Sequence, residues 1–211
     1  LKFTDIKILL SGTGRVGRGT KEVLDFLEIK EVSPDDFINL KFKEPIYTNI
    51  DVLDYNYSNL IENTVSNFYN FPDKFESTFS KFSSLTDIYF AGHYHNPKAP
   101  KLITNQDLKE ISFNIGVIAD ISCDIDGPIA STIRPSTIDD PIYGFHKLNS
   151  VECDFHDTEA IAVMAVDNLP CELPRESSEM FGKMFLKYVI PSFFNNDKAV
   201  SYTHLRAHET D

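Results

Sequence analysis

The chain has 211 residues, 42% of them hydrophobic and 17 of them Phe, so it can fill the core of one large domain or of about one and a half ordinary ones. Its net charge of -12 repels phosphate backbones, which argues against nucleic acid as a partner. It contains no apolar run of about 18 residues, so we predict no membrane-spanning helix and no membrane partner.

The three cysteines, Cys123, Cys153 and Cys171, are odd in number, widely spaced and free of any C-x-x-C pair. They predict neither a zinc ribbon nor a disulfide framework, so we expect a reduced, cytoplasmic setting. The first residue is Leu1 and no charged-then-apolar leader follows it, so we expect the chain to be a piece of a longer protein.

Residues 6–10 form a short Ile- and Leu-rich run that predicts a buried parallel strand. The pattern G-x-G-x-x-G follows directly at Gly12, Gly14 and Gly17, and apolar residues then recur at helical spacing to position 27. In this strand–helix context Gly12 allows a tight turn, Gly14 lets a pyrophosphate approach the backbone, and Gly17 lets the helix pack on the strand. The helix N-terminus then faces the diphosphate, and we expect a dinucleotide site rather than an ordinary glycine turn.

Residues 29–32 predict a second strand, and Asp35 and Asp36 lie 18 and 19 positions after Gly17. In a dinucleotide fold an acid at about this distance binds the ribose 2′-hydroxyl and favours NAD, which is the cofactor we expect, without excluding NADP. The alternative is that residues 33–36 cap the helical turn that follows.

Residues 45–52 and 87–91 predict the third and fourth strands. Between them, apolar residues recur from Phe75 to Leu85 at steps of four and three after Pro72-Asp73, which predicts an amphipathic helix packed on the core.

The fourth strand runs into a loop with His93 and His95. Ligands of open α/β sheets bind beyond the carboxyl ends of the strands, so His93 is a candidate for the cofactor or substrate cleft. The H-x-H pair also suits a metal, but the nearby sequence supplies no further Cys or His and we predict no metal site. A third possibility is that both are surface histidines.

Residues 115–119 predict a fifth strand, followed by Asp120, Asp124 and Asp126. Three carboxylates at the end of a strand are a candidate functional site, but their spacing differs from that of a calcium-binding EF-hand loop. Solvated turn acids are the alternative.

A connection rich in Thr, Ser and Pro then runs to Phe145, with Arg134 as a further guess for the cleft, and residues 161–166 predict a sixth strand. The last helix begins at Pro174 and ends at Pro191, with a broad apolar face from Met180 to Val189. Residues 198–211 differ from everything before them and resemble translated adapter read-through, so we expect no native fold there.

These elements predict an α/β fold with a doubly wound, mostly parallel Rossmann sheet of about six strands and helices on both faces. We expect residues 1–170 to form the dinucleotide-binding domain and residues 171–197 to form a C-terminal helix that packs on it or on a missing substrate domain.

Five segments together resemble the family of saccharopine dehydrogenase (L-lysine-forming) and lysine-oxoglutarate reductase, which is related to alanine dehydrogenase. They are residues 12–19 (GTGRVGRG), 119–128 (ADISCDIDGP), 132–137 (TIRPST), 166–170 (VDNLP) and 172–176 (ELPRE). The similarity extends over about residues 5–197, and the segments at 119–128 and 166–176 are far more specific than the glycines.

The resemblance implies an oxidoreductase of lysine metabolism that interconverts saccharopine with lysine and 2-oxoglutarate by hydride transfer to or from a nicotinamide. It also implies that Gly12, Gly14, Arg15, Val16 and Gly17 hold the diphosphate. Asp124 resembles the family's acid beside the cofactor.

In this family the catalytic Lys and His belong to a substrate domain that precedes the Rossmann domain. That domain is missing here, so no catalytic residue can be assigned and we expect the chain alone to bind cofactor at most. An alanine-dehydrogenase-like oxidoreductase and a non-catalytic NAD-binding module are the alternatives. The sequence leaves the oligomeric state open.

Overall fold

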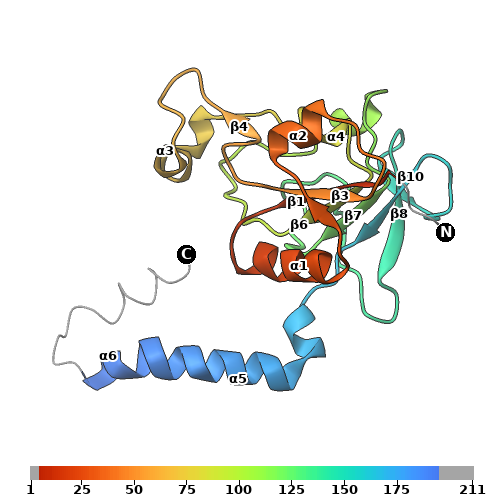
Figure 1. Ribbon diagram of the computed structural model, residues 1–211. Coiled ribbons are helices and arrows are strands. Elements are labelled where there is room, and N and C mark those ends of the chain that lie inside the picture. The colour runs from red at the N-terminus through yellow and green to blue at the C-terminus, as the bar shows by residue number, and fades with distance from the viewer. Residues whose placement is uncertain (1–4, 195–211) are drawn as a thin grey trace. The chain divides into compact units, whose positions relative to one another are not determined.

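In the computed structural model, which describes residues 5–194, eight of the strands form one sheet in the order β2-β3-β1-β6-β7-β10-β8-β9 (Figure 1). All six predicted strands are present, within a few residues of the predicted bounds. They are β1 (Lys7–Ser11), β2 (Lys30–Glu31), β3 (Ile46–Ile50), β6 (Ile88–Ala91), β7 (Val117–Asp120) and β10 (Ala160–Met164). The α/β fold class with a mostly parallel, Rossmann-like sheet is therefore confirmed.

Along the sheet order β2-β3-β1-β6-β7-β10, every pair of neighbouring strands is parallel, so the carboxyl ends of these six strands meet at one edge of the sheet. The register makes this edge exact, because Ser11 of β1 lies beside Ile50 of β3 and beside Ala91 of β6, and Ala91 lies beside Asp120 of β7. We call this row of four residues and the loops that follow it the carboxyl edge. In an open α/β sheet this edge is where ligands bind.

Helices cover both faces of the sheet: α1 (Arg15–Phe26) lies on one face, and α2 (Pro34–Asn39) and α4 (Ser80–Ser83) lie on the other (Figure 1). The remaining helical segments of the sheet unit are α3 (Val65–Asn70) and the two short 3₁₀ turns at Pro72–Lys74 and Asp107–Lys109. The predicted first helix is confirmed, and it buries Gly17 and Leu24 against the sheet.

The core lies between the sheet and its helices. The side chains of β1 at Ile8, Leu9 and Leu10 are almost completely buried, as expected for a central parallel strand that is covered on both faces. Burying each such aliphatic side chain contributes about 1.5–3 kcal/mol.

The predicted helix from Phe75 to Leu85 is wrong. The chain instead forms the strand β5 (Glu76–Ser77), which pairs with β4 (Asn56–Tyr57), and only then the four-residue α4. Phe75, Phe79 and Phe82 are nevertheless buried, so the expected role in the core holds with a different backbone. The Thr78 N–H donates to the Tyr55 carbonyl oxygen rather than to a helical acceptor, which starts the helix later than the pattern suggests.

Between β7 and β10 the chain forms two strands that the sequence did not indicate. β8 (Ile142–His146) pairs antiparallel with β10, and β9 (Val151–Cys153) pairs antiparallel with β8. The sheet therefore ends in an antiparallel hairpin on one side.

The chain divides into two compact units between Asp167 and Asn168. The second unit contains a 3₁₀ turn (Leu169–Glu172), α5 (Pro174–Met184), a π-helical stretch (Phe185–Val189) and α6 (Ile190–Phe194). The predicted domain bounds remain predictions, and the segment 198–211 lies outside the described residues.

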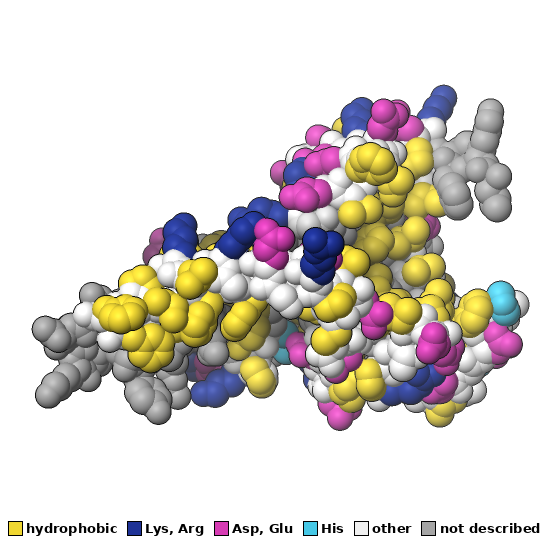
Figure 2. Space-filling view, turned by 90° about the horizontal axis from the view of Figure 1, so that it is seen from below, with side chains coloured by type: hydrophobic (Ala, Val, Ile, Leu, Met, Phe, Trp, Pro, Cys, Tyr) yellow, Lys and Arg dark blue, Asp and Glu magenta, His cyan; other side chains and the backbone are white. Residues whose placement is uncertain are grey.

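The prediction that Pro191 ends the last helix is wrong, because α6 continues to Phe194. Pro191 is the second residue of α6, which continues the helix without a break after the π-helical stretch. Hydrophobic side chains gather along this helical segment beside charged ones (Figure 2). In residues 5–194 no helix combines the length and the apolar character that crossing a bilayer requires.

Candidate functional site

The three glycines form a tight elbow between β1 and α1. Gly12 has a φ of +99°, a left-handed conformation that only glycine adopts easily, and its N–H donates to the Ile50 carbonyl oxygen at 3.1 Å. A Cβ at Gly12 would lie 2.5 Å from the carbonyl oxygen of Gly92, on the loop after β6. The elbow is therefore pressed against a second loop of the carboxyl edge.

Gly17 and Gly14 have opposite surroundings. A Cβ at Gly17 would lie 1.9 Å from the Gly12 carbonyl oxygen, so only glycine lets α1 start this close to β1. A Cβ at Gly14 would meet no protein atom within 4 Å, so the backbone there is open to a ligand. These are the two surroundings that the sequence pattern requires of these positions.

The N-terminus of α1 is built to receive an anion. Gly14 is its N-cap, so no side chain caps the first turn, and that turn contains no acidic residue. Arg15 and Val16 are both exposed there. Backbone N–H groups without intrahelical acceptors, together with the positive end of the helix dipole, suit the diphosphate of a dinucleotide. The residues present thus fit the cofactor that the sequence predicts.

The predicted ribose acids lie at the start of α2. Ser33 caps this helix, since its Oγ accepts a hydrogen bond from the Asp36 N–H at 3.1 Å, and Asp35 and Asp36 are exposed in the first turn. The capping alternative therefore describes the local structure, while a role in binding ribose stays a prediction.

The order of the strands offers a second acid. β3, not β2, is the strand beside β1, and Asp51 directly follows β3 at the carboxyl edge. Asp51 is half-buried, and its backbone lies beside the elbow because the Gly12 N–H bonds to the preceding residue, Ile50. The sequence distance from Gly17 alone did not single out this residue.

His93 lies beneath the elbow, directly after Gly92. Its imidazole is 6% exposed, Nδ1 is 2.7 Å from the Ser11 Oγ, and that Oγ is 2.8 Å from the Tyr89 hydroxyl. Burial, and secondarily the charge of His95, lowers the pKa of His93 to about 4, so the ring is neutral at physiological pH. The other ring nitrogen, Nε2, is buried and has no hydrogen-bond partner in the described part of the chain.

His95 and Asp124 bring the loops after β6 and β7 together. Burial lowers the pKa of the half-buried His95, and Asp124 acts in the opposite direction. Burial and the charge of Asp120 raise the pKa of Asp124, while His95 lowers it. The Asp124 predicted beside the cofactor is thus at the carboxyl edge, on the β6 side of the elbow.

Asp120, the first of the three predicted carboxylates, is fully buried and holds its own loop. It accepts hydrogen bonds from the N–H and Oγ of Ser122, from the Cys123 N–H, and from the Thr132 Oγ1 at 2.6 Å. Its two oxygens are therefore occupied by this chain. Asp126 is exposed, and the Lys101 ammonium donates to its carbonyl oxygen.

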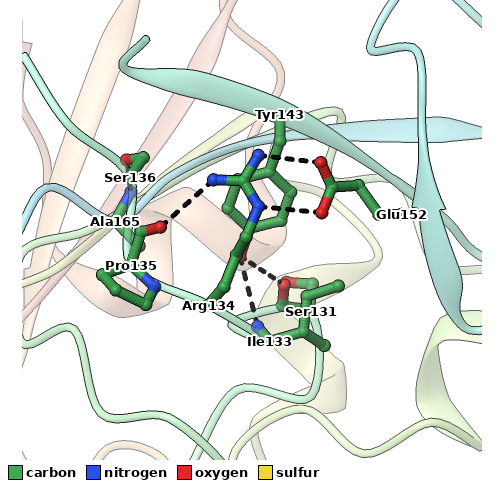
Figure 3. Close-up of polar contacts among 8 residues, drawn as sticks. All are labelled: Ser131, Ile133, Arg134, Pro135, Ser136, Tyr143, Glu152 and Ala165. Carbon is green, nitrogen blue, oxygen red and sulfur yellow. Dashed lines mark hydrogen bonds and ion pairs between the residues drawn. The ribbon is translucent and has the colours of Figure 1, made fainter. Parts of the chain in front are cut away.

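Arg134, the sequence's other guess for the cleft, is held by neighbours (Figure 3). Its guanidinium donates to both carboxylate oxygens of Glu152, at 2.8 and 2.7 Å, and lies 4.5 Å from the centre of the Tyr143 ring. The Tyr143 hydroxyl donates to the Ser131 carbonyl oxygen and accepts from the Ile133 N–H. This arrangement fixes the loop against the β8–β9 hairpin.

Residues 5–194 contain no group of three or more His, Cys, Asp and Glu side chains placed to hold a metal ion. The pair His93 and His95 accordingly has no third ligand among the described residues.

The sequence that forms this site matches a known protein family in part. Residues 91–207 match the family model described as alanine dehydrogenase/PNT, C-terminal domain, which is more than half of the chain. The chain belongs to this family. The match begins at Ala91, the last residue of β6, so it includes the loops with His93 and Asp124 but not the glycine elbow.

Similarity to individual proteins extends over most of the chain. The alpha-aminoadipic semialdehyde synthase of Arabidopsis thaliana is 27% identical over 211 residues, covering 90% of this chain and 20% of the relative. The mitochondrial enzyme of the same name from Mus musculus is 24% identical over 207 residues, covering 87% and 22%. The saccharopine dehydrogenase [NAD(+), L-lysine-forming] of Emericella nidulans is 30% identical over 103 residues, covering 47% and 26%.

The resemblance stated from the sequence is therefore confirmed. The chain spans about a fifth of the length of the first two relatives. The name of the fungal relative gives NAD⁺ as its cofactor, whereas that of the mouse relative places it in mitochondria, so a cytoplasmic setting for this chain stays a prediction.

The sequence did not indicate Ser11, Tyr89 or Asp51 as parts of the candidate site. The sequence does contain a signal for Ser11, because this polar residue follows the apolar run of the central strand and comes directly before the first glycine. Tyr89 and Asp51 become visible only when the strand order is known.

Proposed function

We propose that the elbow at Gly12, Gly14 and Gly17 binds a nicotinamide dinucleotide, and that the chain is the cofactor-binding part of an oxidoreductase that interconverts saccharopine with lysine and 2-oxoglutarate. The observation that carries the first half is the opposite surroundings of Gly14 and Gly17: the helix start is closed toward β1 and open toward a ligand. The second half rests on the named relatives.

The chain's own residues supply binding and orientation. The N–H groups at the start of α1, including those of Arg15 and Val16, donate to the diphosphate. A carboxylate at the end of a strand beside β1 accepts from the ribose hydroxyls, and Asp51 has that position, with Asp35 and Asp36 as the candidates from sequence spacing. A carboxylate there repels a 2′-phosphate, which favours NAD over NADP.

The nicotinamide supplies hydride transfer at the carbon that bears the secondary amine. His93 and Asp124 lie on the loops after β6 and β7, on the side of β1 opposite Asp51. We assign no catalytic residue to this chain. We propose that the small-molecule substrate is an amino acid.

The family name supports a second substrate, alanine. We prefer saccharopine because a relative whose similarity covers 90% of the chain is an alpha-aminoadipic semialdehyde synthase and another is a saccharopine dehydrogenase. A third possibility is a module that binds NAD without catalysis.

Titration of the chain with NADH, followed by the fluorescence of the bound nicotinamide, tests the site. Wild type should bind NADH more tightly than NADPH, and Gly14→Val should abolish binding without unfolding the chain, because its Cβ enters open space. Absence of binding by a folded wild-type chain would refute the proposal. In the full-length protein, NADH formation with saccharopine but not alanine supports the first substrate, the reverse supports the second, and binding without either turnover supports the third possibility.

A further inference from the structure

His93 is enclosed on two sides at the carboxyl edge. Nδ1 contacts the Ser11 Oγ, and on the other side the ring meets the Tyr55 ring at 6.2 Å between centres and 64° between planes. The Ser11 Oγ in turn contacts the Tyr89 hydroxyl. Three polar side chains from β1, β6 and the loop after β6 thus form one buried chain of hydrogen bonds.

The direction of each hydrogen bond among Tyr89, Ser11 and His93 follows from the groups at the two ends of this network. Tyr89 is fully buried, and burial raises the pKa of its hydroxyl well above the usual value, so the O–H is present. The Ser11 Oγ is the hydrogen-bond partner of this hydroxyl, so the Tyr89 O–H donates to the Ser11 Oγ. The Ser11 O–H then donates to His93 Nδ1, and a neutral imidazole that accepts at Nδ1 carries its proton on Nε2.

We propose that Ser11 and Tyr89 are positioning residues that fix His93 as the Nε2–H tautomer, and that this Nε2–H donates to an oxygen of the bound dinucleotide. The proposal rests on the proposed function. A proton on Nδ1 would leave one buried O–H of this network without an acceptor among the described residues. If the Ser11 O–H donated to Tyr89, the Tyr89 O–H would lose its acceptor, and if the Ser11 Oγ accepted from both neighbours, its own O–H would have none.

The position of His93 ties it to the cofactor site. The Gly92 N–H donates to the Ser11 carbonyl oxygen at 3.0 Å, and a Cβ at Gly12 would lie 2.9 Å from the Cα of His93. The imidazole is therefore held directly against the elbow that receives the diphosphate. Nε2 is buried and lacks a partner in the described chain, and a ligand oxygen meets it directly or through one bridging water.

Nitrogen-15 NMR of the histidine-labelled 211-residue chain reads the tautomer directly. In the free protein the His93 signal should show the proton on Nε2, and saturation with NADH should shift that signal while the ring stays neutral. The exposed His156, assigned by its own His156→Gln variant, serves as the reference signal. A proton on Nδ1, or an Nε2–H signal that NADH leaves unchanged, would overturn the proposal.

Two substitutions separate binding from structure. Asn places its amide near the position of Nδ1 and keeps the contact with Ser11, whereas Gln places its amide near the position of Nε2. His93→Gln should retain most of the NADH affinity, and His93→Asn should weaken it by about 10- to 100-fold. Ser11→Ala and Tyr89→Phe should turn the His93 signal into a mixture of tautomers and weaken NADH binding.

A purely structural role gives a different result. Thermal unfolding of each variant is measured beside NADH affinity, and a structural His93 would make both quantities fall together, with Asn tolerated better than Gln. That outcome overturns the inference alone if wild type binds NADH and Gly14→Val does not. A folded wild-type chain without NADH affinity would instead refute the proposed function.

Discussion

Replacing Gly17 with Ala should separate α1 from β1 and weaken the cofactor site. The new Cβ would lie 1.9 Å from the Gly12 carbonyl oxygen, and ordinary contact begins at 3.4 Å, so the helix start has to move by about 1.5 Å. Overpacking of this kind costs about 3 kcal/mol, and the better helix propensity of Ala returns about 1 kcal/mol. The net loss of about 2 kcal/mol corresponds to a fall in Tm of about 4–8 °C for a chain of this size.

Gly19→Ala is the matched control, in the same helix and with the same chemical change. Gly19 is exposed and its Cβ would meet no atom within 4 Å, so stability should rise by about 1 kcal/mol and NADH affinity should stay the same. Differential scanning fluorimetry and NADH titration of both variants provide the comparison. If Gly17→Ala matched Gly19→Ala in both measurements, the close approach of helix and strand would not be what shapes the site.

The buried, neutral His93 should make stability depend on pH, because its pKa of about 4 in the folded protein lies below the ordinary 6.5. Its contribution to the unfolding free energy is complete above pH 6.5, and about 3 kcal/mol is lost as the pH falls to 4. Urea unfolding at several pH values should show this dependence in wild type and a flatter one in His93→Gln. The Arg134 guanidinium lowers the pKa of Glu152, so this ion pair stabilises the fold above the ordinary carboxyl pKa and stops doing so in acid. Because both side chains are about one third or more exposed, Glu152→Gln should lower the unfolding free energy at pH 7 by less than about 1 kcal/mol. A larger loss would contradict an exposed pair. Tyr143→Phe removes the hydroxyl that bonds to the Ser131 carbonyl oxygen and the Ile133 N–H, but these two groups keep their bond to each other at 3.1 Å. Thermal unfolding should therefore show a loss of about 0.5–1.5 kcal/mol, whereas an unchanged Tm would mean that the loop does not depend on this hydroxyl.

The parallel strands could be predicted because the central ones are buried on both faces. The interior of a strand such as β1 is an apolar run, Ile8 to Leu10, and the glycine pattern after the strand predicts both the turn and the following helix. The glycines were also informative for a physical reason, since each occupies a place where a Cβ would meet backbone or close an open approach.

The error between Phe75 and Leu85 has the opposite cause. Aromatic residues at steps of three and four satisfied the helical period, but Ser77 and Thr78 lie among them, and their groups bond locally and across to Tyr55. Side chains of this kind compete with helical hydrogen bonds. The aromatic spacing therefore reported burial correctly and backbone conformation incorrectly.

Distance along the chain indicated Asp35 and Asp36 as candidates for a ribose site, and it did not single out Asp51. That distance assumes that the second strand lies beside β1, whereas here β3 takes that place and β2 lies outside it. The hairpin of β8 and β9 was missed for a similar reason, because its exposed residues break the apolar run that predicts a buried strand.

The close approach of Gly12 and Gly92 joins two segments that are far apart in the sequence. A Cβ at position 92 would lie 3.2 Å from a methyl carbon of Val16 and 3.3 Å from the backbone nitrogen of Gly17, a tight contact between these two segments. We therefore expect that a ligand that displaces the segment after β6 also displaces the elbow, since no other element lies between the two backbones. Occupancy near His93 should then change the affinity of the elbow for its own ligand.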